Sequence, residues 1–363
     1  MRILSVITNL RAERGGPPEV LRNQIQVINK KKKIINVFCL ERISLFFLLR
    51  ALFSISLKKK LNKFLKKYDV IHFHEIWSLK IILLCNFAKK ISCKFMFVGH
   101  GHLDQWSLNQ SIFKKKIFIN FFLKEKFKAA SALFFSNIEE FNDAKKNFKF
   151  QNVFIIPNGI DVKKFVKKNI QVQKKKKIIF FGRIHKKKGI EILINAIKLL
   201  PKNFFNDFEF EICGPGDQKY IKFILSKIKD SSLGDSLKFK NFVKREEKIN
   251  YLSKASIFVL PSFEEGDSIA LKEALALSIP VIISKQCRLS IVEKYDAGIV
   301  IELDENNLKE SFVKISKKDL TEMGKNARKL IEDKFDNEFC SKRVLNIYED
   351  INCGSKSSPD WVI

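Results

Sequence analysis

The sequence predicts an α/β protein made of two doubly wound, parallel-sheet domains. Short apolar runs of strand length alternate with longer segments of helical period, and this succession occurs twice along the 363 residues. The apolar runs lack the strict alternation of a half-exposed sheet, which indicates parallel strands buried on both faces. A chain of this length exceeds one small core and suits two domains.

The expected strands form two successive sets. In the first half they lie at 2–8, 34–40, 69–74, 94–98, 132–136 and 153–156. In the second half they lie at 177–181, 208–213, 237–242, 256–260, 281–284 and 298–302. Between strands, the helical period is seen in Ile190, Leu193, Ile194, Ile197 and Leu200, and the stretch 320–350 is also expected to be helical.

A polar, lysine-rich stretch at 169–176 marks the expected join between the domains. We therefore expect an N-terminal domain over 1–168, a C-terminal domain over 169–345 and a tail over 346–363. Packing of this tail back on the N-terminal domain is an open alternative. Ligands of open α/β sheets bind beyond the carboxyl ends of the strands, so the loops that follow the strands should carry the chemistry.

The formal net charge is +29, which raises nucleic acid or an anionic membrane surface as a partner. The basic residues are mostly lysines, spread over both halves without a recognition motif, so we expect no nucleic acid. The abundance of Lys, Ile, Phe and Asn also fits an AT-rich coding bias, with the lysines on solvated faces. The basic, apolar segment 43–67 either lies on an anionic membrane or packs as a helix with a lysine-rich outer face.

The cysteines and the N-terminus indicate a cytoplasmic protein. The seven cysteines include no C-x-x-C pair, which is typical of reduced thiols. The N-terminus resembles a first strand and not a signal peptide, and the longest apolar run, 43–57, is too short to span a bilayer. A peripheral position at the inner face of the cytoplasmic membrane stays open.

The strongest motif is PSFEEGDSIALKEALALSIPVIIS, at 261–284. The predicted strand ends at Pro261, a glycine-containing loop follows, and a helix begins near Asp267 or Ser268. Backbone N–H groups at a helix start can bind a phosphate or sugar hydroxyls. Glu265 and Glu273 are eight residues apart, about two helical turns, so both carboxylates can face one cleft and accept hydrogen bonds from hydroxyls.

This stretch resembles the E-x7-E signature of the retaining nucleotide-sugar glycosyltransferases of family four, also called group 1, which have the GT-B fold. Further matches follow in the family's order along residues 1 to about 350: Gly15-Gly16, His100-Gly101, Pro157-Asn158-Gly159-Ile160-Asp161, Gly182-Arg183, Lys188-Gly189 and Gly214-Pro215-Gly216. The resemblance implies two Rossmann-like domains facing a central cleft, the first binding the acceptor and the second binding the nucleotide sugar.

The resemblance also implies an activity. It is the metal-independent, retaining transfer of a hexose-type sugar from a nucleotide-sugar donor to a saccharide or lipid-linked acceptor, in the synthesis of lipopolysaccharide or capsule. A soluble small glycoside as the product is an alternative with the same fold. A basic nucleic-acid-binding protein and a non-catalytic sugar-binding relative are the alternatives outside this class.

By the same resemblance, Arg183 and Lys188 neutralise the leaving diphosphate, Glu265 binds the donor hexose and Glu273 binds ribose hydroxyls. His100 contacts the donor sugar near the reacting centre. The remaining donor-side positions are Gly15, Gly16, Gly182, Gly214, Gly266, Asp267, Ser268 and Ile269, and the expected acceptor side consists of His74, Glu75, Trp77, His102 and Trp106. Asp267 departs from the family, which usually has Phe or Leu there.

Two H-x-H pairs, His72 with His74 and His100 with His102, suggest a metal site as an alternative. Residues two apart on a strand share a face, so the geometry is possible. However, no acidic cluster of suitable spacing and no D-x-D motif completes such a site. We therefore expect no metal and no cofactor, with the nucleotide sugar as a substrate.

Overall fold

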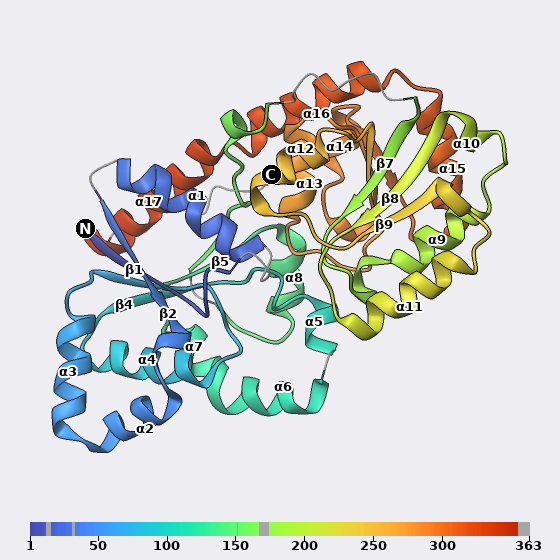
Figure 1. The fold of residues 1–363 in the computed structure, drawn as a ribbon. Coiled ribbons are helices and arrows are strands. Elements are labelled where there is room, and N and C mark those ends of the chain that lie inside the picture. The colour runs from blue at the N-terminus through green and yellow to red at the C-terminus, as the bar shows by residue number, and fades with distance from the viewer. Residues whose placement is uncertain (12–15, 31–32, 110, 151, 167–173, 355–363) are drawn as a thin grey trace. The chain divides into compact units, whose positions relative to one another are not determined.

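The computed structural model describes residues 1–363 except 12–15, 31–32, 110, 151, 167–173 and 355–363, and it also leaves out the side chains of 105, 106 and 245. The chain divides into two compact units (Figure 1): Met1–Gly159 with Asn337–Ile363, and Ile160–Asp336. The chain thus passes between units at 159/160 and 336/337, whereas the sequence led us to expect 168/169 and 345/346. Most of the expected join at 169–176 lies outside the described residues.

In the first unit the described strands form one parallel sheet in the order β2-β1-β3-β4-β5-β6. They are β1 (Arg2–Ile7), β2 (Ile34–Cys39), β3 (Val70–Phe73), β4 (Lys94–Val98), β5 (Ala132–Phe135) and β6 (Val153–Ile155). In the register, Ile3 lies opposite Ile35 on one side and Val70 on the other. The strand order reverses between β1 and β3, and open sheets place their ligand crevice at such a point.

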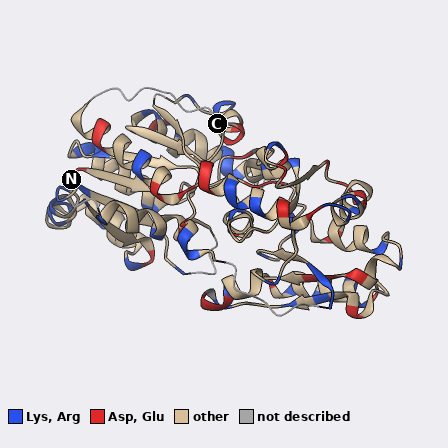
Figure 2. Cartoon of the chain, turned by 90° about the horizontal axis from the view of Figure 1, so that it is seen from above, with Lys and Arg blue, Asp and Glu red and all other residues tan. Residues whose placement is uncertain are grey.

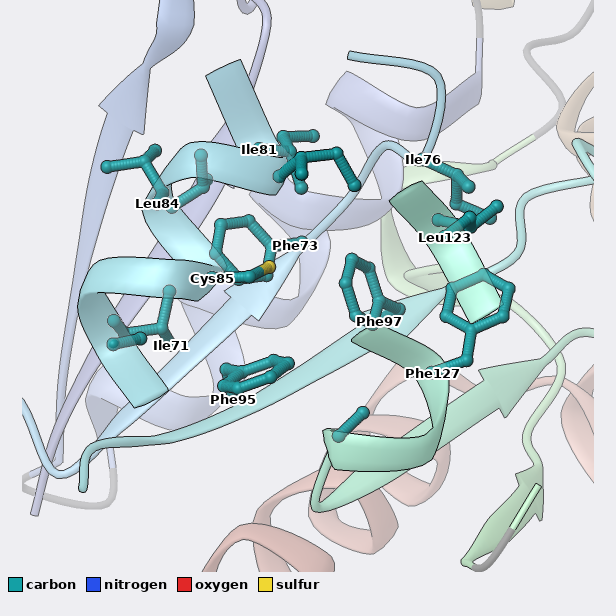
Figure 3. Close-up of a cluster of buried hydrophobic side chains, with 14 of the residues drawn as sticks. Ile71, Phe73, Ile76, Ile81, Leu84, Cys85, Phe95, Phe97, Leu123 and Phe127 are labelled. Carbon is teal, nitrogen blue, oxygen red and sulfur yellow. The ribbon is translucent and has the colours of Figure 1, made fainter. Parts of the chain in front are cut away.

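Helices cover both faces of this sheet. They are α1 (Gly16–Lys30), α2 (Leu45–Phe53), α3 (Ile55–Leu65), α4 (Leu79–Lys90), α5 (Gln105–Asn109), α6 (Ile112–Phe118), the π-helical turn η3 (Ile119–Leu123), α7 (Lys124–Ala129), α8 (Ile138–Lys145) and α17 (Asn337–Cys353), with a 3-10 turn η2 (Leu40–Arg42). Under α2, α3, α4 and α7 lies an aromatic core that includes Phe73, Phe97 and Phe127 (Figure 3). On the opposite face α1 packs beside α17.

The C-terminal helix belongs to the first unit. The stretch 320–350 is helical as expected, and it consists of α16 (Leu320–Lys334) and α17, with a break at residues 335 and 336. α17 belongs to the first unit because it buries Val344, Ile347 and Tyr348 in a core with residues of the first sheet. Packing of the C-terminus on the first unit therefore begins at residue 337, upstream of the tail expected at 346.

The second unit has a parallel sheet in the order β12-β11-β10-β7-β8-β9 within the described residues. Its strands are β7 (Lys176–Phe181), β8 (Phe208–Cys213), β9 (Leu237–Lys240), β10 (Ile257–Leu260), β11 (Val281–Ser284) and β12 (Gly298–Ile301). This is the strand order of a Rossmann domain, with the crevice position between β7 and β10.

The helices of the second unit are, besides α16, α9 (Ile190–Lys198), α10 (Phe204–Asp207), α11 (Gln218–Lys229), α12 (Lys248–Leu252), α13 (Ile269–Ala276), α14 (Ile291–Lys294) and α15 (Glu305–Ser316). Its 3-10 turns are η4 (Val162–Lys164), η5 (Lys186–Lys188), η6 (Gly234–Ser236), η7 (Arg245–Glu247) and η8 (Lys285–Cys287). Along α9, Ile190, Leu193, Ile194 and Ile197 are buried, which confirms the helical period predicted there.

The α/β fold with two parallel sheets is confirmed. Each predicted strand is present in the described part of the chain, with ends within two residues of the prediction. None of the described helices is long and apolar enough to cross a membrane. All the cysteines lie in the described residues, and none forms a disulfide.

Candidate active site

In the second unit, the loops after β7 and β10 meet at the point where the strand order reverses. Lys188, in the 3-10 turn η5, places its Nζ 2.5 Å from Oε1 of Glu265 in the loop after β10. The amide of Phe263 donates to the carbonyl of Lys187 over 2.8 Å. Two of the predicted site residues, 77 positions apart in the chain, are thereby brought into contact.

Glycines allow these loops to approach one another. Gly189 has φ +65°, and a Cβ there would collide with the carbonyl oxygen of Pro261. Gly214, after β8, has φ +153°, and a Cβ there would collide with the carbonyl oxygen of Gly182. A side chain at either position would therefore force the neighbouring loops apart. The positive φ angles are a second reason for glycine, because other residues rarely adopt them.

The Glu265 carboxylate is held in a fixed place. The residue is only 8% exposed, and its Oε1 accepts a hydrogen bond of 2.5 Å from the hydroxyl of Ser262. Its amide donates to the carbonyl of Gln286 over 3.0 Å. Ser262 in turn accepts at its carbonyl from the hydroxyl of Ser284 over 2.6 Å. A buried carboxylate with these partners is a pre-arranged hydrogen-bond acceptor.

The helix α13 begins directly after this loop. Gly266 and Asp267 precede Ser268, whose side chain caps the helix by accepting from the amide of Leu271 over 3.4 Å, and Ile269 is the first helical residue. Glu273, on the second turn, is 2% exposed and pairs with Nζ of Lys248 at 2.5 Å. Each glutamate of the predicted pair therefore has its own lysine partner, and Lys248 was not predicted.

A second unpredicted pair lies on the same helix. Lys272 is 1% exposed, and its Nζ lies 2.6 Å from Oδ1 of Asp267 and 4.2 Å from the centre of the Phe335 ring. A buried ammonium is costly unless it is paired. Asp267, the position that departs from the family, therefore supplies the counter-charge of a buried lysine.

Positive charge is concentrated after β7. Arg183 is exposed, and three lysines follow it in η5. His185 accepts at Nδ1 from the amide of Lys187 over 3.1 Å. Burial, followed by the charge of Arg183 and the lysines, lowers the pKa of His185. This loop is suited to bind an anion such as a diphosphate.

In the first unit, the loops after β1 and β3 are joined by a carboxylate. The amide of Thr8 donates to Oε1 of Glu75 over 3.2 Å, and the Thr8 hydroxyl bonds to Oε2. Both residues lie where the strand order of this sheet reverses. Gly16 begins α1, and its neighbour Gly15 lies outside the described residues.

His100 follows β4 in a left-handed conformation, with φ +46°, and its Nε2 lies 3.3 Å from Nδ1 of His74. His74, expected on the acceptor side, is 1% exposed and its ring stacks on that of His100. The buried His72 hydrogen-bonds through Nδ1 to the hydroxyl of Tyr348 at 2.5 Å. Burial lowers the pKa of His72 to about 3 and the pKa values of His74 and His100 well below the usual 6.5.

Glu140 fixes the backbone around His100, and the sequence did not reveal it as a site residue. It is fully buried on α8 and accepts from the amides of Gly101 at 2.7 Å and Ser136 at 3.2 Å. The signal that could have found it is an Asn137-x-x-Glu140 capping pattern, in which a Glu at this position bonds to preceding amides.

The other residues of the expected acceptor side lie in the first unit. Trp77 donates from Nε1 to the carbonyl of His102 over 3.2 Å, and Nζ of Lys115 lies 4.9 Å from its ring centre. The side chain of Trp106 lies outside the described residues. No group of three or more His, Cys, Asp or Glu side chains in the described part of the chain could hold a metal ion.

Residues 10–330 match two glycosyltransferase families in succession. Residues 10–164 match Glycosyltransferase Family 4, and residues 161–330 match Glycosyl transferases group 1. The chain belongs to these glycosyltransferases. The family named from the sequence is thereby confirmed.

Individual relatives agree with this assignment. The amylovoran biosynthesis glycosyltransferase AmsK of Erwinia amylovora is 30% identical over 53% of this chain, which spans about half (49%) of that relative's length. The O-antigen biosynthesis glycosyltransferase WclY of Escherichia coli is 22% identical over 97% of this chain and 99% of its own. Among solved structures, Anabaena HepE in complex with UDP and glucose has a TM-score of 0.78 at 16% identity, covering 96% of this chain and 100% of its own. The fold is therefore GT-B.

Proposed function

We propose that this protein transfers a hexose-type sugar from a nucleotide-sugar donor to a saccharide or lipid-linked acceptor during the synthesis of a cell-envelope polysaccharide. The observation that carries the proposal is the meeting of Lys188 and Glu265 beside the start of α13. The names of AmsK and WclY support a polysaccharide product, and the HepE complex supports a nucleotide diphosphate as part of the donor.

The second unit supplies groups for each part of such a donor. The exposed guanidinium of Arg183 and the ammonium of Lys188 attract the two phosphates, together with amides at the start of α13. Glu265, with fixed carboxylate oxygens, accepts from hydroxyls of the hexose, and Glu273 accepts from the ribose. In this assignment Lys188, which pairs with Glu265, and Lys248, which pairs with Glu273, also balance the negative charge of the two carboxylates.

The proposed reaction retains the anomeric configuration and needs no metal ion. The bond between the anomeric carbon and the diphosphate oxygen breaks, the acceptor oxygen bonds to that carbon on the same face, and the acceptor proton passes to the leaving oxygen. Arg183 and Lys188 stabilise the charge that develops on the diphosphate. His100, neutral because its pKa is lowered, donates or accepts a hydrogen bond at the sugar without adding charge.

The test is transfer by the purified chain from UDP-, GDP-, ADP- and dTDP-sugars, measured as nucleotide release that depends on an added acceptor. Arg183→Ala should lower kcat/KM at least about a hundredfold, equivalent to roughly 3 kcal/mol of transition-state stabilisation. The matched control Lys222→Ala, at an exposed position on α11, should change it little. Equal losses in both variants would point to bulk charge and would contradict a defined phosphate site.

A further inference from the structure

Two helical segments of the first unit expose apolar side chains to an unusual degree. Among the described residues, the five most exposed large hydrophobic side chains all lie there: Phe53 at 89%, Phe113 at 77%, Phe121 at 76%, Ile55 at 74% and Phe46 at 67%. We name residues 43–67 the α2–α3 segment and residues 111–128 the α6–α7 segment. Monomeric proteins rarely gather exposed aromatic side chains in this way unless the surface binds something.

The exposed side chains of α2 form a stripe along one face. Phe46, Leu49 and Phe53 are spaced three and four residues apart, so they share a face of the helix. The opposite face is buried through Leu48 and Ala51, which pack in the aromatic core of the unit. The inner face of this segment is thus packed against the unit, as the alternative of a packed helix predicts. Packing within the unit does not explain the apolar stripe on the outer face.

The α6–α7 segment repeats this arrangement. Phe113, Ile117 and Phe121 recur at every fourth residue and are exposed, while Ile119 and Leu123 are buried in the same core as α2. The helix α4 contacts α2, α3 and α7, so both segments belong to one helical layer of the unit. In Figure 1 this layer lies along the lower side of the first unit, with α2 and α6 both at its lower edge.

Positive charge accompanies both apolar stripes. The α2–α3 segment contains seven basic residues and no acidic one, and the α6–α7 segment contains six lysines and one glutamate. Lys59 and Lys63 on α3, and Lys66 and Lys67 directly after it, line one surface pocket together with Asn62. Although Lys and Arg occur on both units (Figure 2), the combination with highly exposed aromatic side chains is specific to these two segments within the described residues.

We propose that these two segments form the surface by which the protein docks on an anionic lipid bilayer. Aromatic side chains enter the interfacial region of a bilayer, and lysines beside them interact with lipid phosphates. A second protein copy fits less well, because two surfaces this basic would repel each other. The proposal rests on the proposed function in one respect: a lipid-linked acceptor would lie in the membrane, at its inner face.

The experiment is flotation of the full-length chain with vesicles, without donor or acceptor. We expect binding to vesicles in which phosphatidylglycerol replaces part of the phosphatidylcholine, and much weaker binding to phosphatidylcholine alone. At about 0.5 M salt the screening length falls to a few Å, so binding should drop. Each of Lys63→Gln and Lys66→Gln should weaken binding about fivefold, and the double variant Phe53→Ser/Phe113→Ser should weaken it at least about tenfold.

The control is Lys222→Gln/Phe223→Ser on α11 of the second unit, where the side chain of Phe223 is 42% exposed, and it should bind as the unchanged chain does. Failure to bind anionic vesicles at low salt, or equal binding by all variants, would overturn the proposal. Self-association that is removed by Phe53→Ser/Phe113→Ser without vesicle binding would also overturn it and assign the surface to a second copy. Sugar transfer to a water-soluble acceptor should be unchanged in every variant, so failure of the proposed function would be seen separately.

Discussion

The buried pair between Asp267 and Lys272 allows a quantitative test of how α13 is held. Removing the carboxylate with Asp267→Ala leaves an ammonium that is 1% exposed without its counter-charge. Such a loss costs about 3 to 5 kcal/mol, and we expect the lower end because the Phe335 ring, 4.2 Å away, still attracts the ammonium. In a unit of this size, 3 kcal/mol lowers the Tm by roughly 10 °C.

The complementary variants complete a double-mutant cycle. Lys272→Leu leaves Asp267 near the start of α13, where the helix dipole stabilises a carboxylate, so it should cost only about 1 to 2 kcal/mol. The double variant Asp267→Ala/Lys272→Leu removes both charges at once and should unfold within about 1 kcal/mol of the unchanged protein. The expected coupling free energy is therefore about 3 kcal/mol. It is measured by urea unfolding, followed by circular dichroism, for all four proteins.

The result that refutes this reasoning is additivity. If the two single effects sum to the effect of the double variant within about 0.5 kcal/mol, the two side chains are not coupled, and the pair does not hold the start of α13. Binding of the nucleotide sugar should follow the same order, because the amides at the start of this helix are assigned to the donor.

Three other predictions concern the first unit and the reaction. Glu140→Gln places an amide NH2 against one of two backbone amides and should destabilise the first unit by roughly 2 kcal/mol in urea unfolding; an unchanged midpoint would contradict this. His72, His74 and His100 have pKa values lowered in the folded state, so stability should be lost as pH falls below about 6.5, by up to about 2 kcal/mol for each histidine at pH 5. Unfolding at pH 7 and pH 5 measures this, and asparagine at position 72 should reduce the dependence. Sugar transfer should persist in excess EDTA, because cationic side chains act at the diphosphate; complete loss, restored by Mg²⁺ or Mn²⁺, would sink this assignment.

The sheets could be predicted from the sequence because strands buried on both faces are nearly continuous apolar runs, such as VIIS at Val281–Ser284. The sequence also placed the loops with Lys188 and Glu265 at one edge of a sheet, since parallel strands end at the same edge, but it did not predict the contact between these two side chains. The sequence did not predict that α17 belongs to the first unit. An amphipathic helix shows which of its faces is buried, but its sequence does not say against which sheet.

The buried charges were missed for a related reason. Lys272 and Glu140 each look like a solvent-exposed residue of a helix, and their burial becomes visible only when the partner is known. Lys248 is half-buried, and only its pairing with Glu273 reveals its place in the site. For Glu140 and Glu273 those partners lie 39 and 25 residues away in the chain. His74 is buried against a neighbouring imidazole, and its assignment to the acceptor side stays a prediction.

The assignment of α17 to the first unit has a consequence for how the chain folds as it is synthesised. Residues 160–336 are contiguous, so the ribosome delivers the whole second unit before it delivers α17. Until then the face of the first sheet that includes Ile3, Val70 and Met96 has α1 but lacks α17, which packs beside α1 in the finished protein. The half of the protein that is made first is therefore completed last, and a nascent chain stopped before residue 337 carries a partly uncovered apolar sheet, the kind of surface that chaperones bind.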